Sequence, residues 1–373
     1  MRRICLLCLV AACGDNLEPS HGTDASTQAT DGPPEMSNTI GLTLRDDTYA
    51  IDVTADGTTA VFERVDGFTA TIVFYDTLRH VAVDRTTLAD PSVDLATGVS
   101  NDLRVTAEYN NPVVSAVWSD AASAWITVPN SRATGCDVFH GGAFDISGDG
   151  KTVTGLQYNG CVTEAFRWTD TGGAGTTTTL PLLGTPVGSA KSNRGSVISR
   201  DGRIIAGFAA NGAADRTPAM WDATNKGTLL LPTDTDTPGE VLAINADGSV
   251  LAGTYGNQAF VWTAADKLVM LPVFDGADPA ASSFVNATSA DGTLLFGEIG
   301  DGFSLTPPTA VVWTRTGTTY TVAKLADVCA AAQIIVPGGY ALTNIMGASA
   351  DGKVIVGTAG TDTIGKTFAL RLP

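Results

Sequence analysis

The chain contains few of the residues on which catalytic and metal sites usually depend. Histidine occurs only three times in 373 residues. After residue 13 there is no H-E-x-x-H, G-x-S-x-G or C-x-x-C pattern. These patterns mark zinc peptidases, nucleophile-elbow hydrolases and dithiol oxidoreductases, so their absence argues against all three classes of site.

Positive charge is scarce as well. The chain has 22 Lys and Arg against 39 Asp and Glu, which gives a formal net charge of −17. Nucleic-acid binding requires clustered Lys and Arg that neutralise phosphates, and the sequence has no such cluster. We therefore expect no nucleic-acid partner, and an acidic surface that favours solubility.

Three weaker candidates for chemistry have simpler interpretations. Residues 150–152 (GKT) resemble the end of a phosphate-binding loop, but Asp145 stands where that loop requires Gly. The acidic run 233–240 could supply Ca²⁺ ligands, although a solvated acidic loop explains it more simply. His140 with Asp137 could form an acid–base pair, but this histidine is followed by two glycines in an expected surface loop. We predict no catalytic residue, no cofactor and no metal.

The N-terminal apolar run is too short to span a bilayer, which takes about twenty residues as a helix. Residues 1–12 read MRRICLLCLVAA, two arginines before a short apolar core, as in a secretory signal. The ending LVAAC resembles the bacterial lipobox, and this resemblance implies that Cys13 carries a lipid that holds the protein at a membrane. The alternative is an ordinary signal peptide with an incidental cysteine.

The next stretch contains almost nothing to bury. It is rich in Pro, Ser, Thr, Asp and Gly, which is typical of a disordered tether. We therefore divide the chain into a signal peptide (1–12), a lipidated Cys with its tether (13–38) and a folded domain (39–373).

A motif of a small residue, any residue, Asp and Gly recurs throughout the folded domain. The spacings between successive Asp residues are 46, 47, 52, 46, 44 and 60 residues, a period typical of repeat architectures. An apolar run follows each Asp and ends with Gly in five copies, and an aromatic strand comes later in each of the first six copies. The seven Asp residues are Asp56, Asp102, Asp149, Asp201, Asp247, Asp291 and Asp351.

Each copy predicts four antiparallel strands, for example 143–147, 151–157, 164–169 and 178–183 in the third. Asp-Gly between apolar stretches is a strong hairpin signal, and four strands per repeat make a propeller blade. The last copy is one strand short, and a surplus strand, 40–44, precedes the first turn. We predict an all-β propeller of seven blades, closed by this N-terminal strand. Six blades are the alternative, because Leu103 replaces the turn Gly in the second copy and Phe62 the strand Gly in the first.

The pattern S-x-D-G-x-x-V-x-G followed by A-F-x-W resembles the HAF-type extracellular repeats of exported bacterial proteins, and is clearest in copies three to seven. The resemblance covers nearly all of residues 50–373. It implies a propeller-like fold and export, but no activity.

The repeated Asp residues could suggest a metal or catalytic motif, but seven equivalent acids would serve no single reaction. We interpret all seven as turn residues, and the repeated aromatic residues as packing between sheets.

Three cysteines remain after Cys13. The strand scheme places Cys136 and Cys161 in two loops on the same face of the third blade, so we predict a disulfide between them in an oxidising compartment. Cys329 is left unpaired, and we expect it to be buried in a short helical insertion before the last blade.

The Asp-Gly turns share one face of the predicted ring, and the more variable loops share the other. Because variable loops on a fixed scaffold often carry recognition, we expect a protein or glycan ligand on that face, near the mouth of the central channel. The variable loops are 184–195, 211–218, 299–308 and 323–340.

These features favour a monomeric lipoprotein of the outer membrane or cell surface that acts as a binding or scaffolding module. One alternative is a polysaccharide lyase or hydrolase, which a cluster of channel carboxylates with a Tyr or Arg would favour. Another is a purely structural envelope protein.

Overall fold

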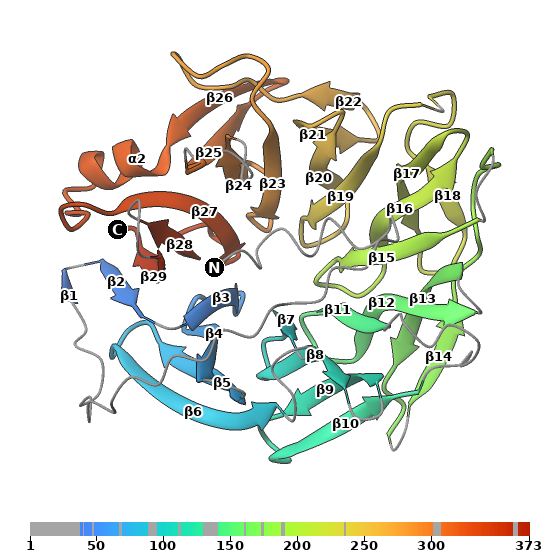
Figure 1. Cartoon of the computed structure of the whole chain (residues 1–373), viewed down its shortest axis with the longest axis horizontal. Coiled ribbons are helices and arrows are strands. Elements are labelled where there is room, and N and C mark those ends of the chain that lie inside the picture. The colour runs from blue at the N-terminus through green and yellow to red at the C-terminus, as the bar shows by residue number, and fades with distance from the viewer. Residues whose placement is uncertain are drawn as a thin grey trace, which may run out of the picture.

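The computed structural model describes residues 38–39, 41–46, 48–66, 69–88, 95–110, 113–129, 141–159, 162–172, 175–187, 191–234, 236–300, 307–360 and 365–373. Seven antiparallel sheets are arranged around a central axis, so the prediction of a seven-bladed propeller is confirmed (Figure 1). Within the described ranges, no helix has the length and apolar character needed to cross a lipid bilayer.

Six blades consist of four consecutive strands each, and in each blade the first strand lies innermost. Blade 1 contains β3 (Thr48–Val53), β4 (Thr59–Asp66), β5 (Thr69–Asp76) and β6 (Val81–Leu88). Blade 2 contains β7 (Leu95–Val99), β8 (Arg104–Asn110), β9 (Val113–Ser119) and β10 (Ala124–Val128). Blade 3 contains β11 (Gly142–Ile146), β12 (Thr152–Asn159), β13 (Val162–Thr169) and β14 (Thr176–Thr179).

The next three blades repeat this arrangement. Blade 4 contains β15 (Asn193–Ile198), β16 (Ile205–Asn211), β17 (Ala214–Trp221) and β18 (Gly227–Leu229). Blade 5 contains β19 (Gly239–Ile244), β20 (Val250–Tyr255), β21 (Gln258–Thr263) and β22 (Lys267–Met270). Blade 6 contains β23 (Ser283–Thr288), β24 (Leu294–Ile299), β25 (Thr309–Thr316) and β26 (Thr319–Lys324).

Blade 7 joins the two ends of the chain, as the surplus N-terminal strand predicts. It contains β27 (Ala341–Ala348), β28 (Val354–Gly360) and β29 (Gly365–Arg371), and β2 (Leu42–Arg45) adds the fourth strand. Leu42 lies opposite Leu370 and Leu44 opposite Phe368, and all four side chains are buried. A two-residue strand, β1 (Asn38–Thr39), extends this sheet beyond the prediction.

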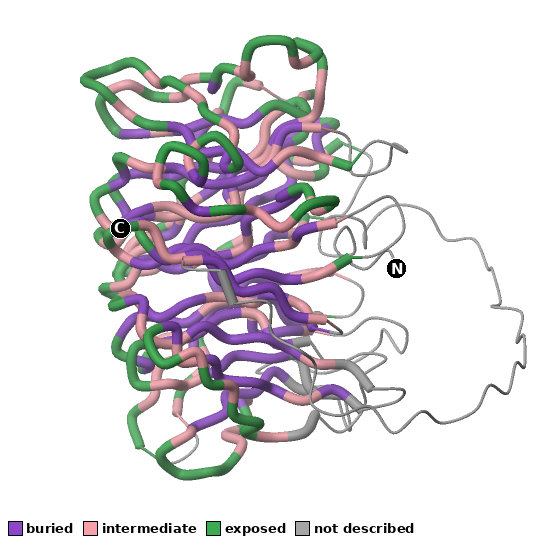
Figure 2. Tube along the Cα trace, turned by 90° about the vertical axis from the view of Figure 1, so that its left-hand side faces the viewer, coloured by how far each residue is buried: buried purple, intermediate pink, exposed green. Residues whose placement is uncertain are grey.

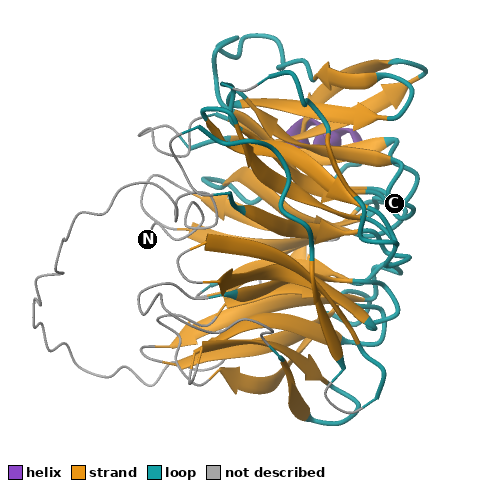
Figure 3. Cartoon of the chain, turned by 90° about the vertical axis from the view of Figure 1, so that its right-hand side faces the viewer, coloured by secondary structure: helices purple, strands orange, loops and turns teal. Residues whose placement is uncertain are grey.

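The core lies between the blades. Strands cross the thickness of the disc with buried residues along most of their length (Figures 2 and 3). Trp168, Trp221 and Trp313 are fully buried in separate inter-blade clusters. The indole N–H of Trp221 donates to the carbonyl of Pro181 in the preceding blade, at 3.1 Å, and that of Trp313 donates to Pro272, at 2.8 Å. The Leu-Pro that ends one blade therefore fixes the aromatic strand of the next.

The glycine six residues after the turn Asp allows a close approach within each blade. A Cβ added to Gly155 would lie 1.9 Å from the carbonyl oxygen of Gly142, and one added to Gly297 would lie 1.9 Å from that of Phe284. Both carbonyls belong to inner strands that bulge just beyond this point. The glycine thus makes room for the bulge.

A short helix, α2 (Leu325–Ala331), lies between blades 6 and 7 (Figure 1). It contains Cys329, whose side chain is fully buried. Cys13, Cys136, Cys161 and His140 lie outside the described residues, so the lipidation, the disulfide and the acid–base pair stay predictions.

Candidate functional site: the central cavity

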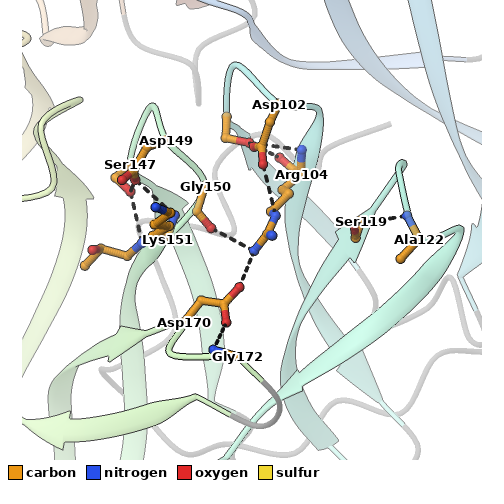
Figure 4. Close-up of polar contacts among 12 residues, drawn as sticks. Asp102, Arg104, Ser119, Ala122, Ser147, Asp149, Gly150, Lys151, Asp170 and Gly172 are labelled. Atoms are coloured by element: carbon orange, nitrogen blue, oxygen red, sulfur yellow. Dashed lines mark hydrogen bonds and ion pairs between the residues drawn. The ribbon is translucent and has the colours of Figure 1, made fainter.

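The Asp-Gly turns share a conserved set of local hydrogen bonds within this chain. In the turn of blade 4, the Ser199 hydroxyl donates to Asp201 Oδ1 at 2.6 Å, and the same carboxylate oxygen accepts the Arg203 N–H at 3.0 Å. Ser199 Oγ also accepts the Ile204 N–H at 3.0 Å. Figure 4 shows the equivalent contacts of Asp149 in blade 3. The turn glycines adopt φ of 69–75°, and Leu103 takes the same left-handed conformation at 62°.

Side chains at this face also connect neighbouring blades. Arg104 of blade 2 donates to the carboxylate of Asp170 in blade 3 at 2.7 Å and to the carbonyl of Gly150 at 3.2 Å (Figure 4). The carboxylate of Asp102 lies 3.2 Å from Arg104 Nε. The turn Asp of blade 2 therefore positions an arginine that holds blade 3.

A closed ring of hydrogen bonds connects the seven turns at the same face. The residue before each turn Asp contributes to it, and we call this set the girdle. Six links are main-chain bonds of 2.8–3.2 Å, and the seventh runs from the Ala55 N–H to Asn101 Oδ1 at 3.0 Å. The girdle residues are Ala55, Asn101, Gly148, Arg200, Ala246, Ala290 and Ala350. In blade 4 the donor of the link to Ala246 is the N–H of the turn residue Asp201, at 3.2 Å.

Every inner strand carries a β-bulge five residues before its turn Asp. A bulge leaves one residue out of the pairing, and here each such residue lines the central cavity. Four of the seven are apolar and three are polar. They are Ile51, Thr97, Phe144, Ser196, Leu242, Asn286 and Met346.

The cavity has a volume of about 630 Å³, within the usual range for small-ligand sites. Its lining extends from Arg200 at the girdle to Asn257 and Ser282 at the loop face. The walls between these ends are mostly aliphatic and aromatic. Four carboxyl groups and two guanidinium groups line the cavity among the described residues.

Two of these carboxylates, Asp52 and Asp145, join neighbouring inner strands. Asp52 accepts the N–H groups of Val53 and Val99, at 2.7 and 3.3 Å. Asp145 accepts those of Ile146 and Ile198, at 2.8 and 2.7 Å. In each aspartate one carboxylate oxygen accepts from its own strand and the other accepts from the inner strand of the following blade.

Burial raises the pKa of both acids above the ordinary value. Burial raises the pKa of Asp145 to about 7, against the opposing hydrogen bond from Ile198, and the charge of Asp52 adds to the increase. Burial also raises the pKa of Asp52, while the positive charge of Arg200 acts in the opposite direction. The pair with Arg200 is the kind of cluster that would favour an enzyme, but its hydrogen bonds serve the scaffold.

A second polar group lies on the wall between blades 4 and 5. The Arg194 guanidinium pairs with Glu240, to which the Ser196 hydroxyl also donates. Arg194 stacks at 5.3 Å over Phe144 and 5.2 Å over Phe208. The charge of this arginine is therefore largely compensated within the wall.

Glu298, on β24, differs from the other cavity acids. No hydrogen bond or ion pair joins it to another described residue, and it lines the cavity. Burial alone raises its pKa to about 7, from the usual 4.5. It is thus a carboxyl group whose ionisation near neutrality no protein cation supports.

One of the variable loops expected from the sequence is shorter in the structure. The expected loop 211–218 is wrong in extent, because β16 continues to Asn211 and β17 begins at Ala214, with these two residues paired. Only Gly212 and Ala213 form the turn. The apolar residues of 205–210 and 219–221 support strands on both sides of this turn.

None of the cavity residues is among the site residues predicted from the sequence. The signal that could have revealed them is a column in the aligned repeats, five positions before the Asp, in which the residue type changes from copy to copy. Glu298 has a similar signal, because only copies one and six carry Glu seven residues after the Asp.

No protein-family model and no curated protein sequence matches the chain. Solved structures do resemble it. An oligogalacturonate lyase from Vibrio parahaemolyticus is 12% identical, with a TM-score of 0.55 over 91% of this chain and 96% of the lyase. The β-propeller domain of Cps50 (Swd1) from Myceliophteria thermophila is 11% identical, with a TM-score of 0.53 over 91% of this chain and 100% of that domain. The propeller domain of the trilobed protease from Pyrococcus furiosus is 10% identical, with a TM-score of 0.51 over 87% and 96%. At these identities the similarity shows the fold alone.

Proposed function

We propose that this chain is an exported lipoprotein of the HAF-repeat type, held at the outer membrane or cell surface through Cys13. Its propeller acts as a monomeric binding module whose ligand enters the central cavity from the loop face. The observation that carries this proposal is the cavity itself, in which each of seven similar blades contributes a different side chain from its bulge.

The division of labour between the two faces supports this direction of entry. The girdle uses main-chain bonds and mostly small residues, so it maintains the ring. The cavity lining reaches the loop face through Asn257 and Ser282. A protein loop or a glycan presented at the cell surface could reach the cavity from there.

A cavity-filling variant tests the proposal. Leu242→Trp places an indole in the cavity. Leu242 is a bulge residue with an apolar side chain, so the substitution removes no side-chain hydrogen bond. Leu78→Trp, at a position 60% exposed on blade 1, adds the same bulk outside the cavity. Glycan arrays and pull-downs from envelope fractions with the purified full chain should give ligands that the Leu242→Trp variant loses and the Leu78→Trp variant retains. Equal binding by both variants would place the ligand elsewhere.

A second candidate function is a polysaccharide lyase or hydrolase. The specific observation in its favour is Glu298, because a half-buried carboxyl whose pKa is raised to about 7 can act as a general acid or base near neutrality. Release of reducing or unsaturated sugar ends from a polysaccharide panel, abolished in Glu298→Gln, would establish it. Absence of ligands and of products in both experiments would leave the structural envelope protein as the remaining interpretation.

A further inference from the structure

The repeats provide an internal comparison for Glu298. It stands seven residues after its turn Asp, and the acid at the same position of blade 1 is Glu63. Glu63 is buried, and its carboxylate accepts the N–H of Ala96 on the inner strand of blade 2, at 2.8 Å. In blade 1 the same residue type in the same place therefore ties one blade to the next.

Glu298 lacks this tie because the facing strand has a different shape. The counterpart of Ala96 in blade 7 is Ile345, on β27. This strand has two bulges, whereas each other inner strand has one. The Asn286 amide fills the space between the strands, donating to the Ile345 carbonyl at 3.1 Å and to Asn344 Oδ1 at 3.0 Å. The second bulge and this amide replace the link that Glu63 makes in blade 1.

Glu298 lines the cavity, and no salt bridge joins it to a cation among the residues that the structure describes. It lies on the same face of β24 as Phe296, which packs against blade 7. On the neighbouring strand β23, Phe284 lies opposite Glu298. None of the cavity-lining residues of β23, β27 and β28 is ionisable. Of the two cavity arginines, Arg194 pairs with Glu240, and Arg200 lies where its charge acts on Asp52 and Asp145.

We propose that Glu298 is the ionic anchor for an organic cation, an amine that carries an aromatic or aliphatic body. The inference rests on the proposed function of the cavity as a binding site, and it names the ligand class. A positively charged nitrogen would supply a counter-ion to this half-buried carboxylate, where ion pairing is stronger than in bulk water. The excess of carboxylates over guanidinium groups favours cations in the whole cavity. The apolar walls, among them Phe284, Leu242 and Met346, would cover the body of the ligand.

Titration calorimetry with matched probes tests this proposal on the purified full chain. The probes are phenethylammonium, the neutral phenethyl alcohol and the anionic phenylpropionate. At pH 8 we expect the ammonium probe to bind at least tenfold more tightly than the alcohol, and the anion more weakly than either. Equal affinities of the ammonium probe and the alcohol in the unaltered protein would overturn the proposal, and this comparison requires no variant.

Two variants then identify the residue. In Glu298→Gln we expect at least a tenfold loss for the ammonium probe and less than a twofold change for the alcohol. Glu63→Gln, at the equivalent position, should change the affinity for the ammonium probe less than twofold. If both variants weaken the ammonium probe equally, the general potential and not Glu298 selects the cation, and the assignment of the anchor is wrong.

The outcomes of this test distinguish a failure of the amine-site proposal from a failure of the proposed function. If Leu242→Trp removes surface ligands but the unaltered protein shows no preference for the ammonium probe, the cavity binds a ligand of another class. If Leu242→Trp keeps every ligand while the ammonium probe still requires Glu298, the amine site stands and the proposed function does not.

Discussion

The main-chain N–H of Ala350 donates to the carbonyl oxygen of Ala55 at 2.8 Å. These residues precede the turn Asp in the last and the first repeat, almost 300 positions apart in the sequence. Their hydrogen bond completes the girdle, and β2 closes the same gap farther from the axis. The ring is therefore closed twice, near the axis by a turn and near the rim by a strand.

Removing the donor at this junction should weaken the ring. Ala350 is the second residue of a turn closed by the Gly352 N–H to Ser349 carbonyl bond of 2.9 Å, a position that favours proline. Ala350→Pro should therefore suit the turn but lose the girdle bond, and lower the free energy of unfolding by about 1–2 kcal/mol. Denaturant unfolding measures this loss of free energy, and Ala350→Ser is the control because it keeps the main-chain N–H. Equal midpoints for the two variants would show that the girdle bond contributes nothing.

Leu103 should be a strained residue, at which glycine is tolerated better than alanine. Its φ of 62° costs a non-glycine residue roughly 1–2 kcal/mol, and the other six turns have Gly there. Leu103→Gly removes this strain but also loses partial packing against the cluster of blades 1 and 2. Leu103→Ala loses the same packing and keeps the strain. We expect Leu103→Gly to exceed Leu103→Ala by about 1 kcal/mol in free energy of unfolding, and the reverse order would contradict the argument.

The turn aspartates should stabilise the fold through their carboxylate oxygens. Asp291 Oδ1 accepts the Ser289 hydroxyl at 2.7 Å and the Thr293 N–H at 3.0 Å, and the hydroxyl bond lowers the pKa of this carboxyl. Asp291→Ala should cost about 1 kcal/mol at pH 7, and Asp291→Asn less, because its amide oxygen can still accept. Because the folded-state pKa is lowered, the charge-dependent part is present above the unfolded pKa. It is lost as the pH falls through the folded value, so unfolding curves of Asp291→Asn and the unaltered protein should converge in acid.

Glu298 should have the opposite pH dependence. Its pKa is raised from 4.5 to about 7, so between these values the folded state holds a proton that the unfolded state releases. Its contribution makes stability fall as the pH rises from 4.5 to 7. Glu298→Gln should therefore match the unaltered protein at pH 4 and be more stable at pH 8, by on the order of 1–3 kcal/mol after allowance for contact with cavity water. Thermal melts at both pH values, without ligand, measure the difference, and a constant offset would contradict it.

The thiols offer a test of the cysteine assignments. Burial raises the pKa of Cys329 to about 11, and its side chain is fully buried, so it should not react with a disulfide reagent in the folded state. After denaturation without reductant, one thiol per chain should react if Cys136 and Cys161 are bonded and Cys13 is lipidated. Reaction of further thiols would refute one of these assignments, and mass spectrometry of the peptides would identify which.

The architecture could be predicted from the sequence because its cause is local and repeated. Each Asp-Gly turn fixes a hairpin, the period fixes four strands, and the strand around Leu42–Leu44 supplies what the last repeat lacks. Even Leu103, which breaks the motif, keeps the turn conformation at a cost in strain. Seven similar local signals thus determine one global ring.

The cavity could not be predicted in the same way because its chemistry depends on relations between blades. Asp52 and Glu298 are both acids in apolar strands. Only the spatial neighbours of each make the first a tie between strands and leave the second without a cation. The extra bulge of β27, which separates Glu298 from Glu63 in role, has no sequence signal that we recognise.

The inner-strand bulge has a consequence for how such a protein can change. In each inner strand the bulged residue five positions before the turn Asp stands outside the pairing, and in blade 5 this residue is Leu242. A point mutation at Leu242 alters the surface of the cavity without disturbing the hydrogen-bonded pairing of the strands around it. A protein built of similar repeats can in this way change its cavity one repeat at a time. The order of the repeats around the ring then determines which side chains face each other, so the cavity is asymmetric although the scaffold is nearly symmetric.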